Sequence, residues 1–273
     1  MTAPTIKHRG RDGRATQAWA TIVLVLVLAG CAAPAQSPPP IRTASDLTEA
    51  DQRAKLRMEL AAAYFSRGQI TTALDEVKQA LIARPDLPEA YNLRALIYAS
   101  MEQPALADES FRRALQLAPA DGAAMNNYGW FLCQRGRFAE AETMFDRAIA
   151  LPQYRDLART LMAKGVCEAR AGDLLKAEAS LVKAVEVDPA NPSIAFNLAE
   201  ILYRRGEFER ARFYIRRVNA SPENVNAQSL WLAARIEHKL GNRIGANGIG
   251  VQLRQRYPES PQSLRFERGQ FDD

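Results

Sequence analysis

Small and bulky apolar side chains recur along this chain in one fixed order, about every 34 residues. In each copy, a first stretch carries small and aromatic positions, a glycine marks a turn, a second stretch reads Ala–x3–bulky–x2–Ala, and a proline follows. The first clear copy consists of Ala61, Tyr64, Gly68, Ala73, Val77, Ala80 and Pro85. Small residues allow two helices to cross closely, and bulky residues fill the space beside the crossing. The pattern therefore predicts an all-α chain built from a repeated pair of helices.

The repeated unit resembles the tetratricopeptide repeat. Its six copies occupy residues 54–87, 88–121, 122–157, 158–191, 192–226 and 227–260. The resemblance implies a right-handed α-solenoid of about six helix-turn-helix repeats within residues 48–260, followed by a C-terminal tail at 261–273. The third copy carries two extra residues near Tyr154–Leu157. The sixth copy departs most, because Gly245, Gly248 and Gly250 each weaken its second helix by about 1 kcal/mol relative to alanine. The capping of the solenoid is therefore left open.

Five copies place a glycine where the first helix of the pair is expected to end. These residues are Gly68, Gly136, Gly172, Gly206 and Gly241. Glycine readily adopts the left-handed conformation that terminates a helix, so the turn of each pair is expected there. The prolines then stop the second helix and start the next unit.

The N-terminus has the three parts of a secretory signal peptide. Basic residues from Lys7 to Arg14 precede a short apolar run, Ala18–Leu28, and small residues follow it. The run is too short for a comfortable membrane span, which needs roughly 20 residues. The sequence Leu28-Ala29-Gly30-Cys31 resembles the lipobox of bacterial lipoproteins. That resemblance implies cleavage after residue 30 and acylation of Cys31, the alternative being a plain signal peptide that happens to meet a cysteine.

The residues after Cys31 predict the membrane in which the lipoprotein is anchored. Ala32 and Ala33 stand where inner-membrane lipoproteins have aspartate or certain charged residues. The family rule therefore predicts a lipid-anchored protein on the periplasmic face of the outer membrane, held there by more than one acyl chain. Residues 32–44 are rich in Pro, Gln and Ser, so residues 31–47 are predicted to be a lipidated cysteine and a disordered tether.

Removal of the leader changes the charge of the chain. Residues 1–30 hold four of the 36 basic side chains and one of the 31 acidic ones, so the net charge falls from +5 to +2. The basic net charge of the full chain is the main argument for a nucleic-acid partner, and a net charge of +2 no longer supports it. Three pairs of arginines are interpreted as solvated helix faces: Arg112-Arg113, Arg204-Arg205 and Arg216-Arg217.

Two cysteines remain once Cys31 carries lipid. Cys133 and Cys167 fall at nearly the same place in the first helices of consecutive repeats, and those helices are expected to lie side by side. Their even number, their register and an oxidising compartment favour a disulfide. The alternative is two buried free thiols, which pack well as small apolar groups.

The sequence contains no pattern of a catalytic or cofactor site. His8 belongs to the leader, and His238 stands alone beside Lys239 at a predicted helix end, where a surface position is expected. No serine lies in a nucleophile-elbow pattern, no cysteine cluster has zinc spacing, and no glycine loop has phosphate-binding form. We therefore expect a binding protein without cofactor or metal, and not an enzyme.

A partner-binding surface is expected where the first helices line the concave face of the solenoid. The groove positions of the repeat select Asn92, Leu96, Asn126, Trp130, Met162, Val166, Phe196, Glu200 and Tyr203. Their apolar members are predicted to form a strip that fits an extended or helical segment of a partner protein. The alternative is that neighbouring helices cover part of this strip and that some of these residues belong to the core.

One stretch of the third repeat is more specific. Residues 126–133 read Asn-Asn-Tyr-Gly-Trp-Phe-Leu-Cys, and Gly136-Arg137-Phe138 and Ala141 follow. Together with the lipobox, the six repeats, the second cysteine and the two-residue insertion, this stretch resembles the PilF/PilW family of outer-membrane lipoproteins of type IV pilus biogenesis, called pilotins.

The family resemblance implies a function. Its members help subunits of the pilus secretin reach the outer membrane and multimerise, so the secretin is the expected protein partner of a chain that is a monomer when free. A lipid-tethered adaptor for another envelope assembly machine is the alternative, and pilus and secretin genes beside this one would favour the first.

Overall fold

The computed structural model describes residues 2, 48–152 and 154–271. The leader, the lipobox with Cys31 and the tether lie outside the described residues. By its internal contacts the chain divides into two units, Met1–Leu47 and Thr48–Asp273. The fold below is that of the second unit.

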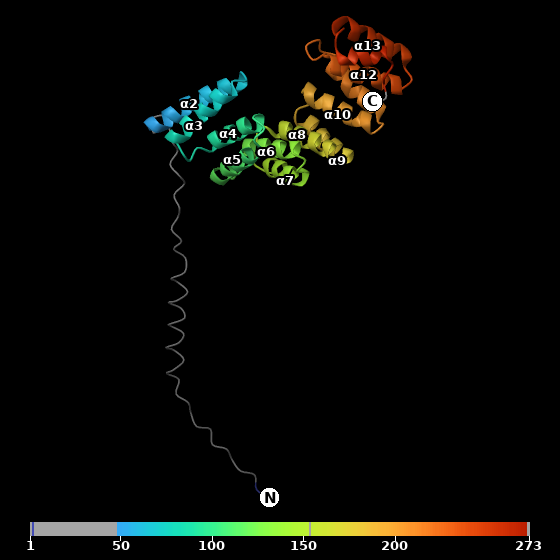
Figure 1. Ribbon diagram of the computed structural model, residues 1–273. Helices are drawn as coiled ribbons and strands as arrows, with labels where there is room; N and C mark the ends of the chain where they lie inside the picture. Colours follow the sequence, from blue (N-terminus) through green and yellow to red (C-terminus); the bar gives the residue numbers. More distant parts are fainter. Residues whose placement is uncertain (1, 3–47, 153, 272–273) are drawn as a thin grey trace. The chain divides into compact units, whose positions relative to one another are not determined.

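Thirteen α-helices make up the described part of the second unit. They are α2 (Glu49–Ser66), α3 (Ile70–Ala83), α4 (Pro88–Ser100), α5 (Pro104–Leu117), α6 (Gly122–Gln134), α7 (Phe138–Ile149), α8 (Leu157–Arg170), α9 (Leu174–Val187), α10 (Pro192–Arg204), α11 (Phe208–Asn219), α12 (Ala227–Lys239), α13 (Arg243–Arg256) and α14 (Pro261–Glu267). Helices α2 to α13 form six consecutive pairs, and each pair packs on the next (Figure 1). The expected all-α solenoid of six helix pairs is confirmed.

The alanines of the repeat lie where the two helices of a pair cross. In the third pair, Ala141 and Ala148 on α7 are fully buried, and Phe145 between them is also fully buried. Gly129 on α6 faces this ring, because a Cβ atom added there would lie 2.8 Å from Cε1 of Phe145. The small and large positions of the sequence pattern therefore fit into one another across the pair.

The turns within the pairs follow the predicted glycines. All five have positive φ, from 73° to 92°. The second pair has Glu102 at this position instead, with a φ of 56°. The same left-handed turn thus ends α4 with a side chain that tolerates the conformation less well than glycine does.

The insertion in the third repeat closes over the start of α6. The hydroxyl group of Tyr154 donates to the carbonyl oxygen of Gly122 at 3.1 Å and lies 3.0 Å from Oγ1 of Thr160. A Cβ atom on Gly122 would come within 2.6 Å of the Tyr154 ring. The extra residues therefore join the third and fourth pairs.

The sixth pair is complete, and the chain continues beyond it as an ordered cap. Residues 261–267, expected to belong to a tail, form helix α14, which contacts α12 and α13. Gly250 on α13 receives the ring of Phe266, since a Cβ atom at Gly250 would lie 1.9 Å from Cζ of that ring. One of the three glycines that weaken α13 is thus needed for packing.

Candidate partner-binding surface

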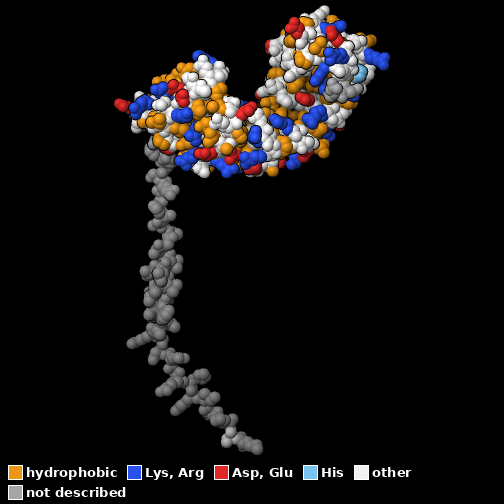
Figure 2. Space-filling view, in the orientation of Figure 1, with side chains coloured by type: hydrophobic (Ala, Val, Ile, Leu, Met, Phe, Trp, Pro, Cys, Tyr) orange, Lys and Arg blue, Asp and Glu red, His pale blue; other side chains and the backbone are white. Residues whose placement is uncertain are grey.

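The first helices of the pairs line the inner side of the second unit. Figure 1 shows α4, α6 and α8 on this side and α5, α7 and α9 on the other, and Figure 2 shows the unit hollowed there. The predicted groove residues lie on α4, α6, α8 and α10. All of them therefore stand on first helices of the pairs.

Most of the predicted groove residues are open to solvent in part. Glu200 is exposed, and the half-buried ones are Asn92, Leu96, Trp130, Met162, Val166 and Phe196. Leu96 and Trp130 pack on the core cluster around Phe111 and Phe145. Met162 and Phe196 pack on the next cluster along the chain. Four repeats thus contribute half-buried apolar side chains, which we call the inner strip: Leu96, Trp130, Met162, Val166 and Phe196.

Two predicted groove residues are buried, and the expectation for them is corrected. Asn126 is only 6% exposed because its Oδ1 accepts a hydrogen bond of 3.0 Å from Oγ1 of Thr160 on the next repeat. Tyr203, expected to be partly exposed, is only 8% exposed. Its ring lies 4.5 Å from the guanidinium of Arg235, and its hydroxyl group donates to the carbonyl oxygen of Phe271 at 3.4 Å. A neighbouring repeat covers the first residue, and the C-terminal segment covers the second.

The stretch 126–133 joins α6 to the repeats on both sides. Asn126 bonds to the fourth repeat, as above, while Asn127 donates to Oδ1 of Asn92 in the second repeat at 3.3 Å. Tyr128 donates to Oδ1 of Asp108 on α5 at 2.8 Å. Most of this stretch therefore has a structural role, and Trp130 is its half-buried aromatic member.

Asp108 is the centre of a polar network between the second and third repeats. Besides the Tyr128 hydroxyl, it accepts a bond of 2.7 Å from Nη1 of Arg137, and its Oδ2 lies 2.8 Å from Nε of Arg112. Burial acts to raise the pKa of Asp108, but the hydrogen bonds from Tyr128 and Arg137 and the charges of both arginines outweigh it, so the pKa lies below its usual value. The ionised carboxylate therefore stabilises this junction.

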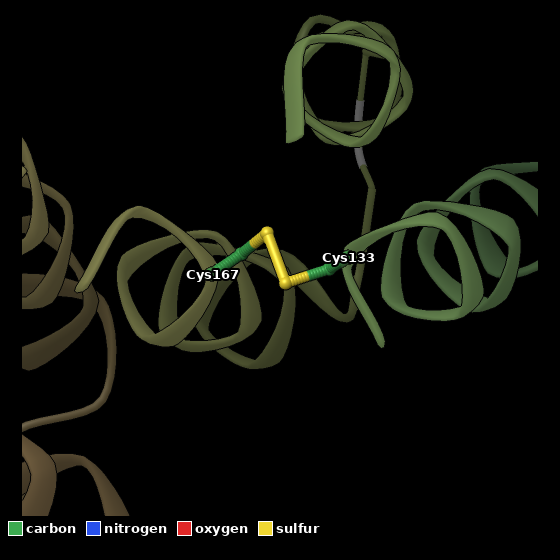
Figure 3. Close-up of a disulfide and its surroundings, with 2 residues drawn as sticks. All are labelled: Cys133 and Cys167. Carbon is green, nitrogen blue, oxygen red and sulfur yellow. A yellow bond between two sulfur atoms is a disulfide. The ribbon is translucent and has the colours of Figure 1, made fainter. Parts of the chain in front are cut away.

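A disulfide joins the first helices of the third and fourth repeats. The structure links Cys133 on α6 to Cys167 on α8, with 5.8 Å between the Cα atoms (Figure 3). Both residues are buried. The pair thus has the register that was expected from the sequence, and it connects the third and fourth repeats.

A depression on the outer side was not expected from the sequence. It has a volume of about 480 Å³ and lies between α5 and α7, over α6. Its lining includes Arg112, Leu115, Tyr128, Leu132, Met144 and Arg147. Arg112, expected to be a solvated residue, also donates to the Tyr128 hydroxyl oxygen at 3.3 Å. Arg112 stands on α5 and Tyr128 on α6, 16 residues later, so this bond joins two consecutive helices.

The titratable and apolar side chains of the described residues bear on two kinds of feature, a metal site and a membrane span. Within residues 48–152 and 154–271, no three His, Cys, Asp or Glu side chains gather as a metal site would need, and no helix is long and apolar enough to cross a bilayer. His238 is exposed, and its ring stacks on Phe271 at 4.1 Å. Burial raises the pKa of Glu168, which accepts a bond of 2.7 Å from Ser180. Glu168 follows Cys167 on α8, and its partner Ser180 is on α9.

Comparison with known proteins supports the same architecture. The family model described as tetratricopeptide repeat matches residues 98–165 and 168–236. The type IV pilus assembly protein PilF of Pseudomonas aeruginosa is 28% identical over 217 residues, which are 80% of this chain and 86% of PilF.

Two solved structures resemble the second unit. The structure of PilW, described as a widely conserved type IV pilus biogenesis factor, aligns with a TM-score of 0.72 and 32% identity, covering 78% of this chain and 97% of PilW. That of Pseudomonas aeruginosa PilF aligns with a TM-score of 0.71 and 26% identity, covering 81% of this chain and all of the other. The chain therefore belongs to the family of tetratricopeptide repeat proteins that includes the type IV pilus proteins PilF and PilW.

Proposed function

We propose that this chain is a pilotin, a lipid-anchored protein that binds subunits of a type IV pilus secretin and promotes their localisation and multimerisation in the outer membrane. The observation that carries the proposal is the similarity to PilW and PilF over about four-fifths of the chain. The lipobox at Leu28–Cys31 supports the anchor and the outer-membrane location. The protein acts by binding and not by catalysis.

The inner strip is the proposed contact for the secretin. Leu96, Trp130 and Phe196 come from three different repeats and are each half-buried. A row of apolar side chains on successive helices fits the apolar face of an extended or helical segment. Asn92 and Glu200 lie among the same helices and supply polar neighbours. Such a segment would lose apolar surface to the strip while its polar side remains in water.

The anchor is tested by replacing the acylated residue. Cells that lack their own copy are complemented with either the parent chain or Cys31→Ala, and their membranes are separated. We expect the variant to leave the outer-membrane fraction and the amount of SDS-resistant secretin multimer there to fall. The parent chain, expressed to the same level, is the matched control.

Two results would contradict the proposal in different ways. Normal outer-membrane fractionation of Cys31→Ala would contradict the anchor. A mislocalised variant with unchanged secretin multimers would contradict the secretin role, and would favour the lipid-tethered adaptor for another envelope machine.

A further inference from the structure

The end of the chain occupies the inner side of the sixth repeat. After α14 the backbone turns at Gly269, which has a φ of 69°, and Phe271 lies against α10 and α12. Figure 1 shows the C-terminal end of the ribbon beside these two helices. The side chains that receive Phe271 stand on α12 at the fifth, ninth and twelfth positions of the sixth repeat, which are Trp231, Arg235 and His238. These are the groove positions of the repeat.

The ring of Phe271 is held by aromatic groups on α12 and α14. Its centroid lies 5.5 Å from that of Trp231 and 4.1 Å from that of His238, and the planes differ by 25° and 6°. Phe266 on α14 meets the same ring edge-on at 5.6 Å. Stacked and edge-to-face pairs at such distances are favourable beyond the area that they bury. These ring contacts thus suit a flat aromatic side chain.

The backbone of Phe271 is held as well as its ring. Its carbonyl oxygen accepts a hydrogen bond of 3.1 Å from Nε of Arg235 and one of 3.4 Å from the hydroxyl group of Tyr203. The guanidinium of Arg235 lies 4.5 Å from the Tyr203 ring, so the two donors also contact each other. A pair of side-chain donors aimed at one peptide carbonyl is a means of binding a peptide segment, since it is independent of the segment's other side chains.

We propose that Tyr203, Trp231, Arg235 and His238 form a second peptide-binding site, specific for an aromatic residue and its own carbonyl group, and that Phe271 fills this site as an internal ligand. The partner is a protein segment that supplies an aromatic ring and the carbonyl group of the same residue. The seated Phe271 defines this chemistry. The site lies between α10 of the fifth repeat and α12 of the sixth, and it does not depend on the identity of the pilus partner.

An internal ligand lowers the apparent affinity for an external one. A short linker holds the tethered group at an effective concentration in the millimolar range. An external segment must therefore displace Phe271, and its apparent dissociation constant equals the intrinsic one divided by the fraction of molecules whose site is empty. Weakening the internal contact should increase the affinity for an added peptide without any change in the four site residues.

The test uses the full chain in detergent and a peptide added in trans. The probe is the heptapeptide of residues 267–273, Glu-Arg-Gly-Gln-Phe-Asp-Asp, labelled with fluorescein at its N-terminus. Fluorescence anisotropy measures its binding to the parent chain and to Phe271→Ala. We expect Phe271→Ala to bind the probe about tenfold tighter than the parent or more. Leu264→Ala, at a 45% exposed position of α14, is the matched control and should bind like the parent.

Two further measurements test the chemistry of the site. A probe with alanine in place of its phenylalanine should bind neither protein, whereas tyrosine or tryptophan there should preserve binding. The double variant Arg235→Gln, Phe271→Ala should bind the probe more weakly than Phe271→Ala alone, because one of the two hydrogen-bond donors to the carbonyl oxygen is lost. If Phe271→Ala loses its circular dichroism signal, Phe271→Leu retains most of the apolar volume and provides the same comparison.

The proposal is overturned by any of three results from folded proteins. These are equal binding of the probe to the parent and the Phe271 variant, no binding to the variant, and equal binding of the alanine probe. None of them bears on Cys31 or on secretin multimers, so failure here is distinguishable from failure of the proposed function.

Discussion

The third and the sixth repeats both bury polar and aromatic side chains of their first helix, but through different neighbours. In the third repeat, Asn126 and Tyr128 are covered by adjacent repeats, and Cys133 is bonded to one. In the sixth repeat, Trp231 is covered by Phe271 from the end of the chain. Interior repeats gain their stability from the interfaces on both sides, whereas a terminal repeat needs a cap. Asn126 and Trp231 stand at the same position of their repeats and are equally buried, so the comparison shows that one groove position is covered by different neighbours according to its place in the array.

The largest effect is expected from the disulfide of the central repeats. Replacing both Cys133 and Cys167 by alanine removes a cross-link that closes a loop of about 35 residues, and should lower the free energy of unfolding by about 3–4 kcal/mol. Urea unfolding of the parent and the double variant measures it. Reduction of the parent should have a similar effect, and equal stability of oxidised and reduced parent would contradict the cross-link.

The helix crossing of the third repeat should tolerate little extra volume. Ala141 is fully buried against α6, so Ala141→Leu should cost about 1–3 kcal/mol through overpacking. Ala139 lies two residues earlier on the same helix and is exposed, so Ala139→Leu is the matched control and should have little effect. Thermal melts that show the two variants to be equally stable would contradict the assigned crossing.

Replacing two glycines of the sixth repeat by alanine should change the stability of the protein in opposite directions. Gly250→Ala would place a Cβ atom inside the contact with Phe266, so α14 must shift, at a cost of about 1–2 kcal/mol. Gly248 faces open space, and Gly248→Ala should stabilise α13 by up to about 1 kcal/mol through helix propensity. Circular dichroism melts of the two variants measure the contrast, and a shift of the same sign in both would contradict the packing of the cap.

The smallest effect concerns the polar junction at Asp108. Its pKa lies below the usual carboxyl value, so its contribution is present above about pH 4 and is lost as the pH falls through the folded-state pKa. Asp108→Asn should therefore be less stable than the parent by about 1 kcal/mol at pH 7, and the difference should shrink below pH 4. Melts at several pH values test the sign, and a difference that grows in acid would contradict it.

The sequence predicted the repeat architecture because its small residues have fixed spacing. The crossing alanines, the turn glycines and the register of Cys133 and Cys167 all follow from the period, and the structure has them at the expected places. The repeat pattern assigns the same groove positions to every repeat, so it did not identify which of these positions are covered by other parts of the chain. Asn126 is buried by Thr160, which follows the irregular insertion, and Tyr203 by Phe271, whose segment has no repeat pattern.

The cap itself had only a weak signal in the sequence. Gly250 was interpreted as a weakness of α13, although it accommodates Phe266. Phe271 stands two residues from the end of the printed sequence and belongs to no periodic pattern. Contacts between a segment of this kind and a distant helix depend on the path of the backbone, so periodicity does not reveal them.

The central claim is that the inner strip binds the secretin, and the affinity of the Trp130→Ala variant for the secretin tests it most directly. Trp130 is the half-buried aromatic residue of the stretch 126–133, and truncation of an aromatic anchor costs about 2 kcal/mol or more, which is roughly a 30-fold loss of affinity. Leu175→Ala, at a 67% exposed position on α9, is the control and should bind like the parent. The measurement is capture of secretin fragments by the full chain, with circular dichroism on each variant. We predict weaker capture by a folded Trp130→Ala, whereas unchanged capture, or loss of the fold in that variant, would contradict binding at the inner strip.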